Sequence, residues 1–364
     1  MPAMNDPTSP DPLPAPVPHG GNLSDAVRRY GIARDRWTDL STGINPHGYP
    51  VPPIDPAAWL RLPDDDDDLE PIAAQYYGAR HTLAVAGTQA AIRMLPQCLP
   101  RGTVAIHALT YGEYAPAFVH AGFDVEHFVD ASIVAEATAG AGAGAGATHP
   151  HRLEPGAALP SHWRHLVIVN PNNPTTQQFD VDTLLTWHRE LVRRGGTLIV
   201  DEAFADAVPE HSVAPYADMP GIIVLRSVGK FFGLAGARAG FLVADMRTLD
   251  AARHLRGPWS VSGPARAVVR SALLDTEWQH AMRVRLEHDS TRLQALLESH
   301  GLCACRTSLF AWIADPDAAT RHDRLAKTGV WVRQFERVAS LRIGLPGDET
   351  GWKALSAGLL AART

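Results

Sequence analysis

Short apolar segments alternate with helical segments between Leu83 and Asp245, and this alternation constrains the fold more than any other feature of the sequence. The apolar segments are nearly continuous runs of aliphatic residues, which is typical of strands buried on both faces. We expect strands at residues 82–87, 103–109, 124–129, 165–170, 197–203, 222–228 and 238–244. Helices are expected between several of them, at residues 89–95, 114–121 and 181–194. The order predicts an α/β fold with a large, mostly parallel seven-stranded sheet and helices on both faces.

The pattern changes after about residue 250, where residues 266–300 carry helical apolar spacing with many Arg and Glu residues. Shorter segments follow, with strands expected at 309–313, 330–332 and 340–343 and a helix near 352–362. A run of Ala and Gly at 135–147 is predicted to be a flexible surface insertion. We therefore divide the chain into a disordered Pro-rich tail at 1–18, an arm at 19–50 that packs on the small domain or reaches across the site at the strand ends, a large domain at 51–250 and a small α+β domain at 251–364.

Composition excludes several classes of protein. With 33 Lys and Arg against 39 Asp and Glu, the formal net charge is −6, which argues against a nucleic-acid partner. No apolar run reaches the ~18 residues of a membrane span, and the N-terminal residues lack the pattern of a signal peptide. The cysteines number 3, an odd count that favours a reducing compartment, and no Cys/His pattern predicts a metal site. We expect a cytoplasmic protein without nucleic-acid, membrane or metal partners.

Lysine is scarce, since only Lys230, Lys327 and Lys353 are lysines among the 33 basic residues. Lys230 follows an apolar strand, in the segment Ser227-Val-Gly-Lys-Phe-Phe-Gly-Leu-Ala-Gly-Ala-Arg238. A lysine at the end of a buried strand is costly unless its pKa is lowered or its charge is paired. Because a desolvated amine is a good nucleophile towards a carbonyl, Lys230 is a candidate for the covalent lysine of a pyridoxal phosphate enzyme, with Ser227 and Arg238 holding the phosphate. On this motif alone, a solvated lysine is the simpler alternative.

Two more motifs follow predicted strands. Residues 170–174 read Asn-Pro-Asn-Asn-Pro and include Asn173, and Asp201 ends the apolar segment Leu-Ile-Val-Asp. In sheets of this kind ligands bind at the carboxyl ends of the strands. There an aspartate can pair with a protonated pyridine nitrogen, and an asparagine can donate to a ring oxygen. Each motif alone is ambiguous, because Asn-Pro is typical of turns and a strand-end Asp is typical of helix caps.

In this order and spacing, the motifs together resemble those of the fold type I pyridoxal phosphate enzymes of the aminotransferase class I/II superfamily, from about residue 19 to the end of the chain. The resemblance implies pyridoxal 5'-phosphate as cofactor, with Lys230 as the Schiff-base lysine and Asp201 as the partner of the pyridinium. Asn173 is then the partner of the ring oxygen. The resemblance also implies a homodimer with active sites near the subunit interface.

The same resemblance assigns the rest of the cofactor site. Gly87-Thr88-Gln89 stands at a strand-to-helix turn, matching the loop whose backbone N–H groups bind the phosphate. Tyr111 matches the aromatic residue stacked on the ring. The implied catalytic residues are Lys230, Asp201, Asn173 and Tyr111. The implied cofactor-binding residues are Gly87, Thr88, Gln89, Tyr111, Asn173, Asp201, Ser227, Lys230 and Arg238.

Two segments near the N-terminus, His19-Gly-Gly-Asn22 and Ser41-Thr-Gly-Ile-Asn-Pro46, are singly no more than glycine turns around an Asn-Pro. As a pair they resemble the start of the threonine-phosphate decarboxylases of cobalamin biosynthesis, relatives of histidinol-phosphate aminotransferase. The acidic segment 62–70 resembles that group too, and physically it is expected to be a solvated turn before a helix N-terminus. The resemblance implies decarboxylation of L-threonine O-3-phosphate to (R)-1-amino-2-propanol O-2-phosphate and CO₂.

A substrate of this kind, a small phosphorylated amino acid, needs two anion sites. Arg342 matches the arginine that clamps the α-carboxylate in the superfamily. Arg333 is the best candidate for the substrate phosphate, with His19 and Asn45 as candidates to assist it, and Gly43 is also expected to bind substrate. Holding both ends of the substrate would favour decarboxylation over the proton abstraction that begins transamination.

An aminotransferase of the histidinol-phosphate type is the alternative, since it shares every cofactor residue. The chain departs from that type where Tyr is usual at Leu62 and Phe204, where Ser is common at Gly229 and where Gly is usual at Thr176. A non-catalytic regulator built on the same fold agrees less well with the intact Lys230 and the net acidity. Serine phosphate stays open as a substrate, because one methyl group in a pocket is worth only about 1–3 kcal/mol.

Overall fold

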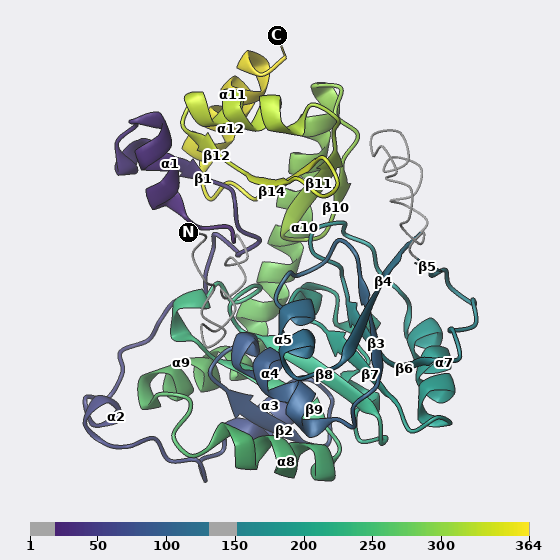
Figure 1. Cartoon of the computed structure of the whole chain (residues 1–364). Helices are drawn as coiled ribbons and strands as arrows, with labels where there is room; N and C mark the ends of the chain where they lie inside the picture. The colour runs from purple at the N-terminus through teal and green to yellow at the C-terminus, as the bar shows by residue number, and fades with distance from the viewer. Residues whose placement is uncertain (1–18, 131–150, 364) are drawn as a thin grey trace, which may run out of the picture.

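The computed structural model describes residues 19–130 and 151–363, with a large sheet below a smaller one (Figure 1). The large sheet is 8-stranded, in the order β2-β9-β8-β7-β6-β3-β4-β5. β9 is antiparallel to both of its neighbours, and the other adjacent strands are parallel. The strands are β2 (Thr82–Val85), β3 (Thr103–His107), β4 (Asp124–Val129), β5 (His151–Arg152), β6 (Trp163–Val169), β7 (Thr197–Asp201), β8 (Ile222–Ser227) and β9 (Gly240–Ala244).

This sheet confirms the predicted α/β fold class, with two differences in detail. All the expected strands are present, but the short strand β5 pairs with β4 and makes the sheet 8-stranded rather than seven-stranded. β9 begins at Gly240 rather than at Arg238, because Arg238 has φ 51°, in the left-handed region that a strand does not contain. The predicted tail at 1–18 and the predicted insertion at 135–147 lie outside the described residues.

Helices cover both faces of the large sheet (Figure 1). Successive strand residues point to opposite faces, so Leu83 of β2 packs in one core with α4, α5 and α8, whereas Ala84 packs in the other with α3, α7 and α9. None of the helices in the described ranges is both long and apolar enough to cross a membrane. The helices of this part are α2 (Ala57–Leu60), α3 (Leu69–Tyr76), α4 (Thr88–Met94), α5 (Tyr114–His120), α7 (Val181–Val192), α8 (Met246–Arg256) and α9 (Gly263–Leu274).

The smaller sheet is antiparallel, in the order β10-β11-β14-β13, and the long helix α10 connects it to the large part (Figure 1). The expected helical stretch at 266–300 is two helices, because the Asp275 side chain caps α10 by accepting the N–H of Trp278 at 3.0 Å. Since α8 crosses residue 250 and α9 packs on α3, the domain limits stay predictions. The elements are α10 (Thr276–Ser299), β10 (Cys305–Arg306), β11 (Phe310–Ala314), α11 (Ala318–Lys327), β12 (Val330–Trp331), β13 (Arg333–Phe335), β14 (Ser340–Gly344) and α12 (Glu349–Ala361).

The N-terminal arm lies against the small part. Its elements are α1 (Leu23–Tyr30) and β1 (Thr38–Asp39), and β1 pairs in parallel with β12. Ala26 of α1 packs in an apolar cluster with Trp331. Just after β1, the carbonyl oxygen of Ser41 accepts a hydrogen bond from Arg342 Nη2 at 2.6 Å. The arm therefore packs on the small part and also reaches a residue predicted to bind substrate.

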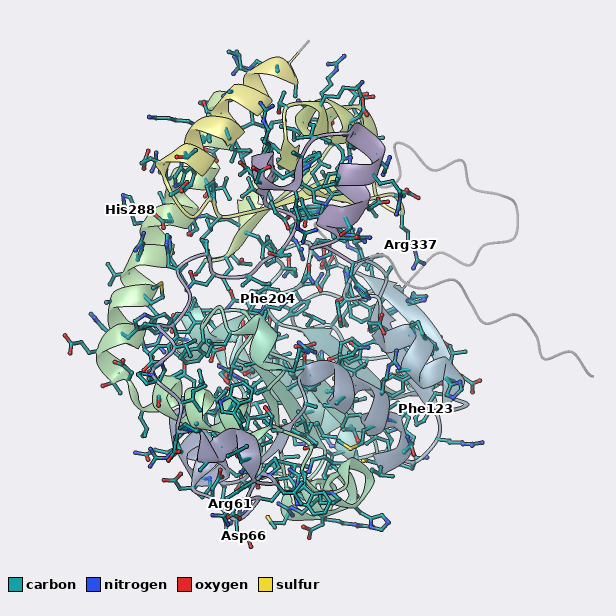
Figure 2. The ribbon with its side chains drawn as sticks, turned by 90° about the vertical axis from the view of Figure 1, so that its left-hand side faces the viewer. Arg61, Asp66, Phe123, Phe204, His288 and Arg337 are labelled. Carbon is teal, nitrogen blue, oxygen red and sulfur yellow. The ribbon has the colours of Figure 1, made fainter. Side chains whose placement is uncertain are left out.

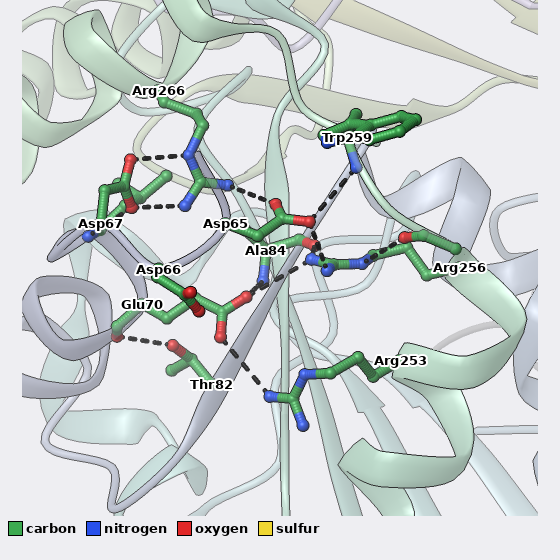
Figure 3. A network of polar contacts seen from close by, with 12 residues as sticks. Asp65, Asp66, Asp67, Glu70, Thr82, Ala84, Arg253, Arg256, Trp259 and Arg266 are labelled. Carbon is green, nitrogen blue, oxygen red and sulfur yellow. Dashed lines mark hydrogen bonds and ion pairs between the residues drawn. The ribbon is translucent and has the colours of Figure 1, made fainter. Parts of the chain in front are cut away.

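The acidic segment before α3 forms ion pairs with arginines of α8 and α9 (Figure 3). Arg266 Nε donates to Asp67 Oδ2 at 2.7 Å, and Arg256 Nη2 donates to Asp65 Oδ2 at 3.2 Å. Both arginine side chains are almost completely buried, so their charges need these carboxylates. Asp67 Oδ1 also accepts the N–H of Leu69, the first residue of α3. The segment is a turn before a helix N-terminus, as predicted, and its alternate Asp side chains are exposed. The prediction lacked its structural role, because the other side chains tie α3 to α8 and α9.

Candidate active site

A cavity lies at the carboxyl ends of the strands of the large sheet. Asp201 and Ser227 are the last residues of β7 and β8, which are adjacent and parallel, so their side chains are brought to the same edge. The cavity is lined by every residue predicted to bind the cofactor, namely Gly87, Thr88, Gln89, Tyr111, Asn173, Asp201, Ser227, Lys230 and Arg238. The fold thus gathers motifs that are far apart in the sequence.

Lys230 stands at the centre of this site. Burial, together with the positive charge of Arg342, lowers the pKa of its ammonium group to about 8, although Asp201 opposes the shift. An ordinary lysine has a pKa near 10.4, so at pH 7 the neutral, nucleophilic fraction rises from well under a thousandth to roughly a tenth. The Nζ atom lies 5.4 Å from the centre of the Phe204 ring, which supplies part of the apolar surroundings. The lowered pKa therefore makes the amine a better nucleophile towards a carbonyl at neutral pH.

Asp201 presents a buried carboxylate. Its Oδ2 accepts the hydroxyl proton of Tyr114 at 2.8 Å, and its Oδ1 accepts the N–H of Ala203 at 3.0 Å. Burial raises the pKa of Asp201, against the effect of these hydrogen bonds and of Lys230. A cation placed beside the carboxylate would be stabilised by it. Sequence reasoning missed Tyr114, whose only signal is its place in the segment that begins at Tyr111.

The opposite end of the cavity suits a phosphate. Gly87 has φ 76° and directly precedes α4, whose first N–H groups point out of the helix. A Cβ atom at Gly87 would lie only 2.8 Å from Arg238 Nη2, so glycine is what allows the guanidinium to approach this turn. Ser227 adds a hydroxyl, whose oxygen accepts the N–H of Gly229 at 3.2 Å. An arginine, a hydroxyl and a helix start together are a strong anion site.

Glu113, which sequence reasoning missed, connects the wall of this cavity to the N-terminal arm. Tyr111 donates its hydroxyl proton to Gln89 Oε1 at 3.0 Å, and Gln89 Nε2 donates to Glu113 Oε2 at 2.6 Å. The other oxygen of Glu113 lies 2.8 Å from His19 Nε2. Burial, with help from the charge of Glu113, raises the pKa of Tyr111 to about 12, so this phenol stays protonated. The chain of contacts fixes His19 beside the ring of Tyr111.

Arg342, on β14, is buried and makes hydrogen bonds only to neutral groups among the described residues. Its Nη1 donates to Asn173 Oδ1 and its Nη2 to the carbonyl oxygen of Ser41, while its Nε has no hydrogen-bond partner. Burial, together with the nearby charge of Arg333, lowers the pKa of Arg342 to about 10. A carboxylate bound in the cavity would stabilise the charged guanidinium and so offset the free-energy cost of its desolvation.

A second cavity, of about 550 Å³, adjoins the first, because Tyr111, Asn173 and Lys230 line both. Gly43 lies between two rings, and a Cβ atom there would come within 2.9 Å of both Phe204 and Phe310. Of the residues predicted to bind substrate, this cavity is lined by His19, Gly43, Arg333 and Arg342. It is also lined by Arg337, which sequence reasoning missed.

Asn45 is the predicted substrate residue that the structure places elsewhere. Its Nδ2 donates to the carbonyl oxygen of Phe231 at 2.7 Å, and its Oδ1 accepts the N–H of His47 at 2.8 Å. Its own N–H donates to the carbonyl oxygen of Lys230 at 3.0 Å. Because the side-chain amide is bonded to backbone groups of the protein, Asn45 holds the segment that carries Lys230, and it does not line the second cavity.

The departures from the histidinol-phosphate type have distinct structural settings. Phe204 and Gly229 line the first cavity, so the phenol and the hydroxyl that are usual at these two positions in the histidinol-phosphate type are absent here. Leu62 is exposed, away from both cavities. Thr176 has φ 65°, the left-handed conformation that glycine adopts more readily than other residues.

Comparison with known proteins agrees with this geometry. Residues 61–351 match the family model for aminotransferase class I and II. The threonine-phosphate decarboxylase of Pseudomonas aeruginosa is 45% identical, over 94% of this chain and 97% of its own, and that of a Sinorhizobium species is 38% identical, over 94% and 98%. The crystal structure of histidinol-phosphate aminotransferase from Sinorhizobium meliloti with pyridoxal-5'-phosphate superposes with a TM-score of 0.75 over 95% of both chains, and at 17% identity it shows the shared fold. The chain therefore belongs to the aminotransferase class I and II family, in the group that includes the threonine-phosphate decarboxylases.

Proposed function

We propose that the protein is a pyridoxal-phosphate-dependent carboxy-lyase that converts L-threonine O-3-phosphate into (R)-1-amino-2-propanol O-2-phosphate and CO₂ in cobalamin biosynthesis. The observation that carries the proposal is the charge of the second cavity. Apart from Tyr111, the ionisable residues that line it within the described part of the chain are all basic, namely His19, Lys230, Arg333, Arg337 and Arg342. Such a lining suits a substrate with a carboxylate and a phosphate. The relatives that match over nearly the whole chain are decarboxylases of such a substrate by name.

The first cavity fits pyridoxal phosphate. The glycine turn at Gly87, which a Cβ atom would fill, and the guanidinium of Arg238 suit the phosphate, and the buried carboxylate of Asp201 suits the pyridine nitrogen. Lys230 would bind the cofactor covalently, and Asn173 would contact its ring oxygen. The bound cofactor supplies a carbonyl for the substrate amine and a conjugated ring that takes up electrons from the bond that breaks.

The residues of the chain then direct the reaction. Arg342 binds the carboxylate from a fixed position, because Asn173 and the Ser41 carbonyl hold its guanidinium, and this sets the direction of the bond between Cα and the carboxyl group. Phe310, whose ring centre lies 5.3 Å from the guanidinium carbon, helps to exclude water. Lys230 lines both cavities, and with a pKa of about 8 its Nζ can hold or release a proton near neutral pH.

Product analysis tests this function. Protein loaded with pyridoxal phosphate should release CO₂ from L-threonine O-3-phosphate in equal amount to the aminopropanol phosphate formed. Lys230→Ala should lose both turnover and the visible absorbance of the lysine-bound cofactor. Stoichiometric α-keto acid without CO₂ would contradict the decarboxylase and support an aminotransferase of the histidinol-phosphate type.

We also propose that the protein is a homodimer located in the cytoplasm. Helix α2 protrudes from the large part (Figure 1). Large apolar side chains are exposed on this helix and in the chain on either side of it, at Val51, Trp59, Leu60 and Leu62, and Trp259 is exposed as well. Exposed apolar surface of this kind is typical of an interface. Cys98, Cys303 and Cys305 are all free thiols, which agrees with a reducing compartment. Light scattering should report twice the chain mass, and Leu60→Ser with Trp59→Ser should shift the protein towards monomer; a wild-type monomer at micromolar concentration would refute the dimer.

A further inference from the structure

Arg337 lies where the small part meets the large one (Figure 2). It is in the turn between β13 and β14, and its Nη1 donates to the carbonyl oxygen of Ala108 at 3.2 Å. Ala108 directly follows β3 of the large sheet. Phe335 and Val338, on either side of Arg337, pack in the same apolar cluster as Leu109. These contacts hold the turn that carries Arg337 at the strand ends.

From this position Arg337 lines the second cavity, which is the substrate cavity of the proposed function, together with Arg333 and Arg342. It also lines an adjoining outer pocket of about 370 Å³. The carboxylates of Asp25 and Glu336 line the outer pocket and not the substrate cavity. The arginine side chains of the substrate cavity therefore face a space that no acidic side chain of residues 19–130 and 151–363 lines.

Arg337 has no carboxylate partner in the described part of the chain. Across residues 19–130 and 151–363, no ion pair joins Arg337 to an Asp or Glu side chain. Its charge is felt by His127, whose pKa is lowered by burial and, to a smaller degree, by Arg337. The Ala108 carbonyl occupies one N–H group of a guanidinium that has five. The side chain keeps both its charge and donors for a ligand.

A phosphate monoester carries close to two negative charges at neutral pH. Arg342 is used by the substrate carboxylate in the proposed function, and this leaves Arg333 as the single arginine so far assigned to the phosphate. Two guanidinium groups match the charge of a dianion, and their planar forks match the geometry of its oxygens.

We propose that Arg337 binds the substrate phosphate together with Arg333, and that it is a specificity-determining residue for phosphorylated amino acids. This inference rests on the proposed function, because that function supplies the phosphate. Arg337 reaches across from the small part to the strand ends of the large part, so the phosphate would be bound at the junction of the two parts.

The test compares Arg337→Gln with Arg363→Gln in the holoenzyme. Arg363 is a matched control, since it is also an exposed arginine that donates to a backbone carbonyl, that of Ser299, but it lines neither cavity. We expect kcat/KM for threonine phosphate to fall about 10- to 100-fold in Arg337→Gln, mainly through KM, because a hydrogen bond to a charged group is lost. The inhibition constant of inorganic phosphate should rise by a similar factor, and Arg337→Lys should restore part of both.

A spectral titration with L-2-aminobutyrate, which lacks the phosphate, separates binding from structure. Its dissociation constant should be unchanged in Arg337→Gln. Equal weakening of both ligands would show that the contact with Ala108 is only structural and would overturn the proposal, as would a change below twofold for phosphate. If the wild-type protein binds threonine phosphate but releases no CO₂, the proposed function fails, and the titration still decides the role of Arg337.

Discussion

Replacing Arg226 by methionine should expose how strongly the cofactor site depends on a buried ion cluster behind it. Arg226 Nη1 lies 2.5 Å from Glu202 Oε2, and its Nη2 lies 2.8 Å from Asp206 Oδ1. The side-chain exposures are 2% for the arginine and 0% for both acids. The guanidinium carbon also lies 4.5 Å from the centre of the Tyr77 ring. Because Glu202 follows Asp201 and Arg226 precedes Ser227, the cluster supports two residues of the cofactor cavity.

Removing one partner of a buried pair typically costs about 3–5 kcal/mol, because a charge is left uncompensated. Arg226→Met leaves the buried carboxylates of Glu202 and Asp206 without their cation. We therefore expect the free energy of unfolding to fall by about 3–5 kcal/mol or slightly more. Burial raises the pKa of Glu202 in the folded protein, and Arg226 opposes that shift. Without Arg226 the folded pKa of Glu202 rises further, so the folded variant binds more protons than the unfolded chain. Its stability should therefore fall as the pH rises from the ordinary glutamate value through the raised one.

Urea-induced unfolding at pH 5.5 and pH 8, followed by circular dichroism, measures both effects. The variant should lose more stability relative to the wild type at pH 8 than at pH 5.5. Adding Glu202→Gln and Asp206→Asn should recover much of the loss, since the buried negative charges are then gone. Arg292→Met is the control, because its pair with Glu349 is at the surface and should contribute little. A loss below 1 kcal/mol in Arg226→Met, or a triple variant no more stable than the single one, would refute the reasoning.

Three further variants test other contacts. Gly87→Ala should weaken pyridoxal phosphate binding about tenfold in an absorbance titration, since its Cβ would lie 2.8 Å from Arg238 Nη2 at a φ of 76°. Asn45→Ala should lower the free energy of unfolding by about 1–2 kcal/mol in chemical unfolding, because the side-chain amide binds backbone groups. It should leave KM for threonine phosphate within about twofold, and a large rise in KM would show that Asn45 binds substrate after all. Asp67→Asn should cost about 1–3 kcal/mol in the same unfolding assay, because it leaves the buried Arg266 partly unpaired, and an unchanged midpoint would contradict this.

The cofactor site is predictable from sequence because its main residues end a strand or follow one within a few positions. Lys230, Asp201 and Ser227 follow apolar segments, and the geometry of a parallel sheet brings such positions to one edge without further information. Glu113 and Arg337 carry no comparable local signal. Glu113 contacts His19 across 94 residues, and Arg337 contacts Ala108 across 229. These contacts depend on how the small part packs on the large part, and the periodicity of apolar residues in the sequence does not predict that packing.

The arginines show what sequence reasoning lacks and what the structure adds. A guanidinium is charged wherever it lies, so composition cannot separate an arginine that stabilises the fold from one that binds a ligand. The described structure separates them by their partners. Arg226 and Arg266 are buried beside carboxylates of the same chain, and their charges are balanced on folding. Arg342 is buried as deeply, but its hydrogen bonds within the described residues go to the neutral oxygens of Asn173 and Ser41. An uncompensated buried cation is costly, so the anion that balances Arg342 has to be one that the protein binds.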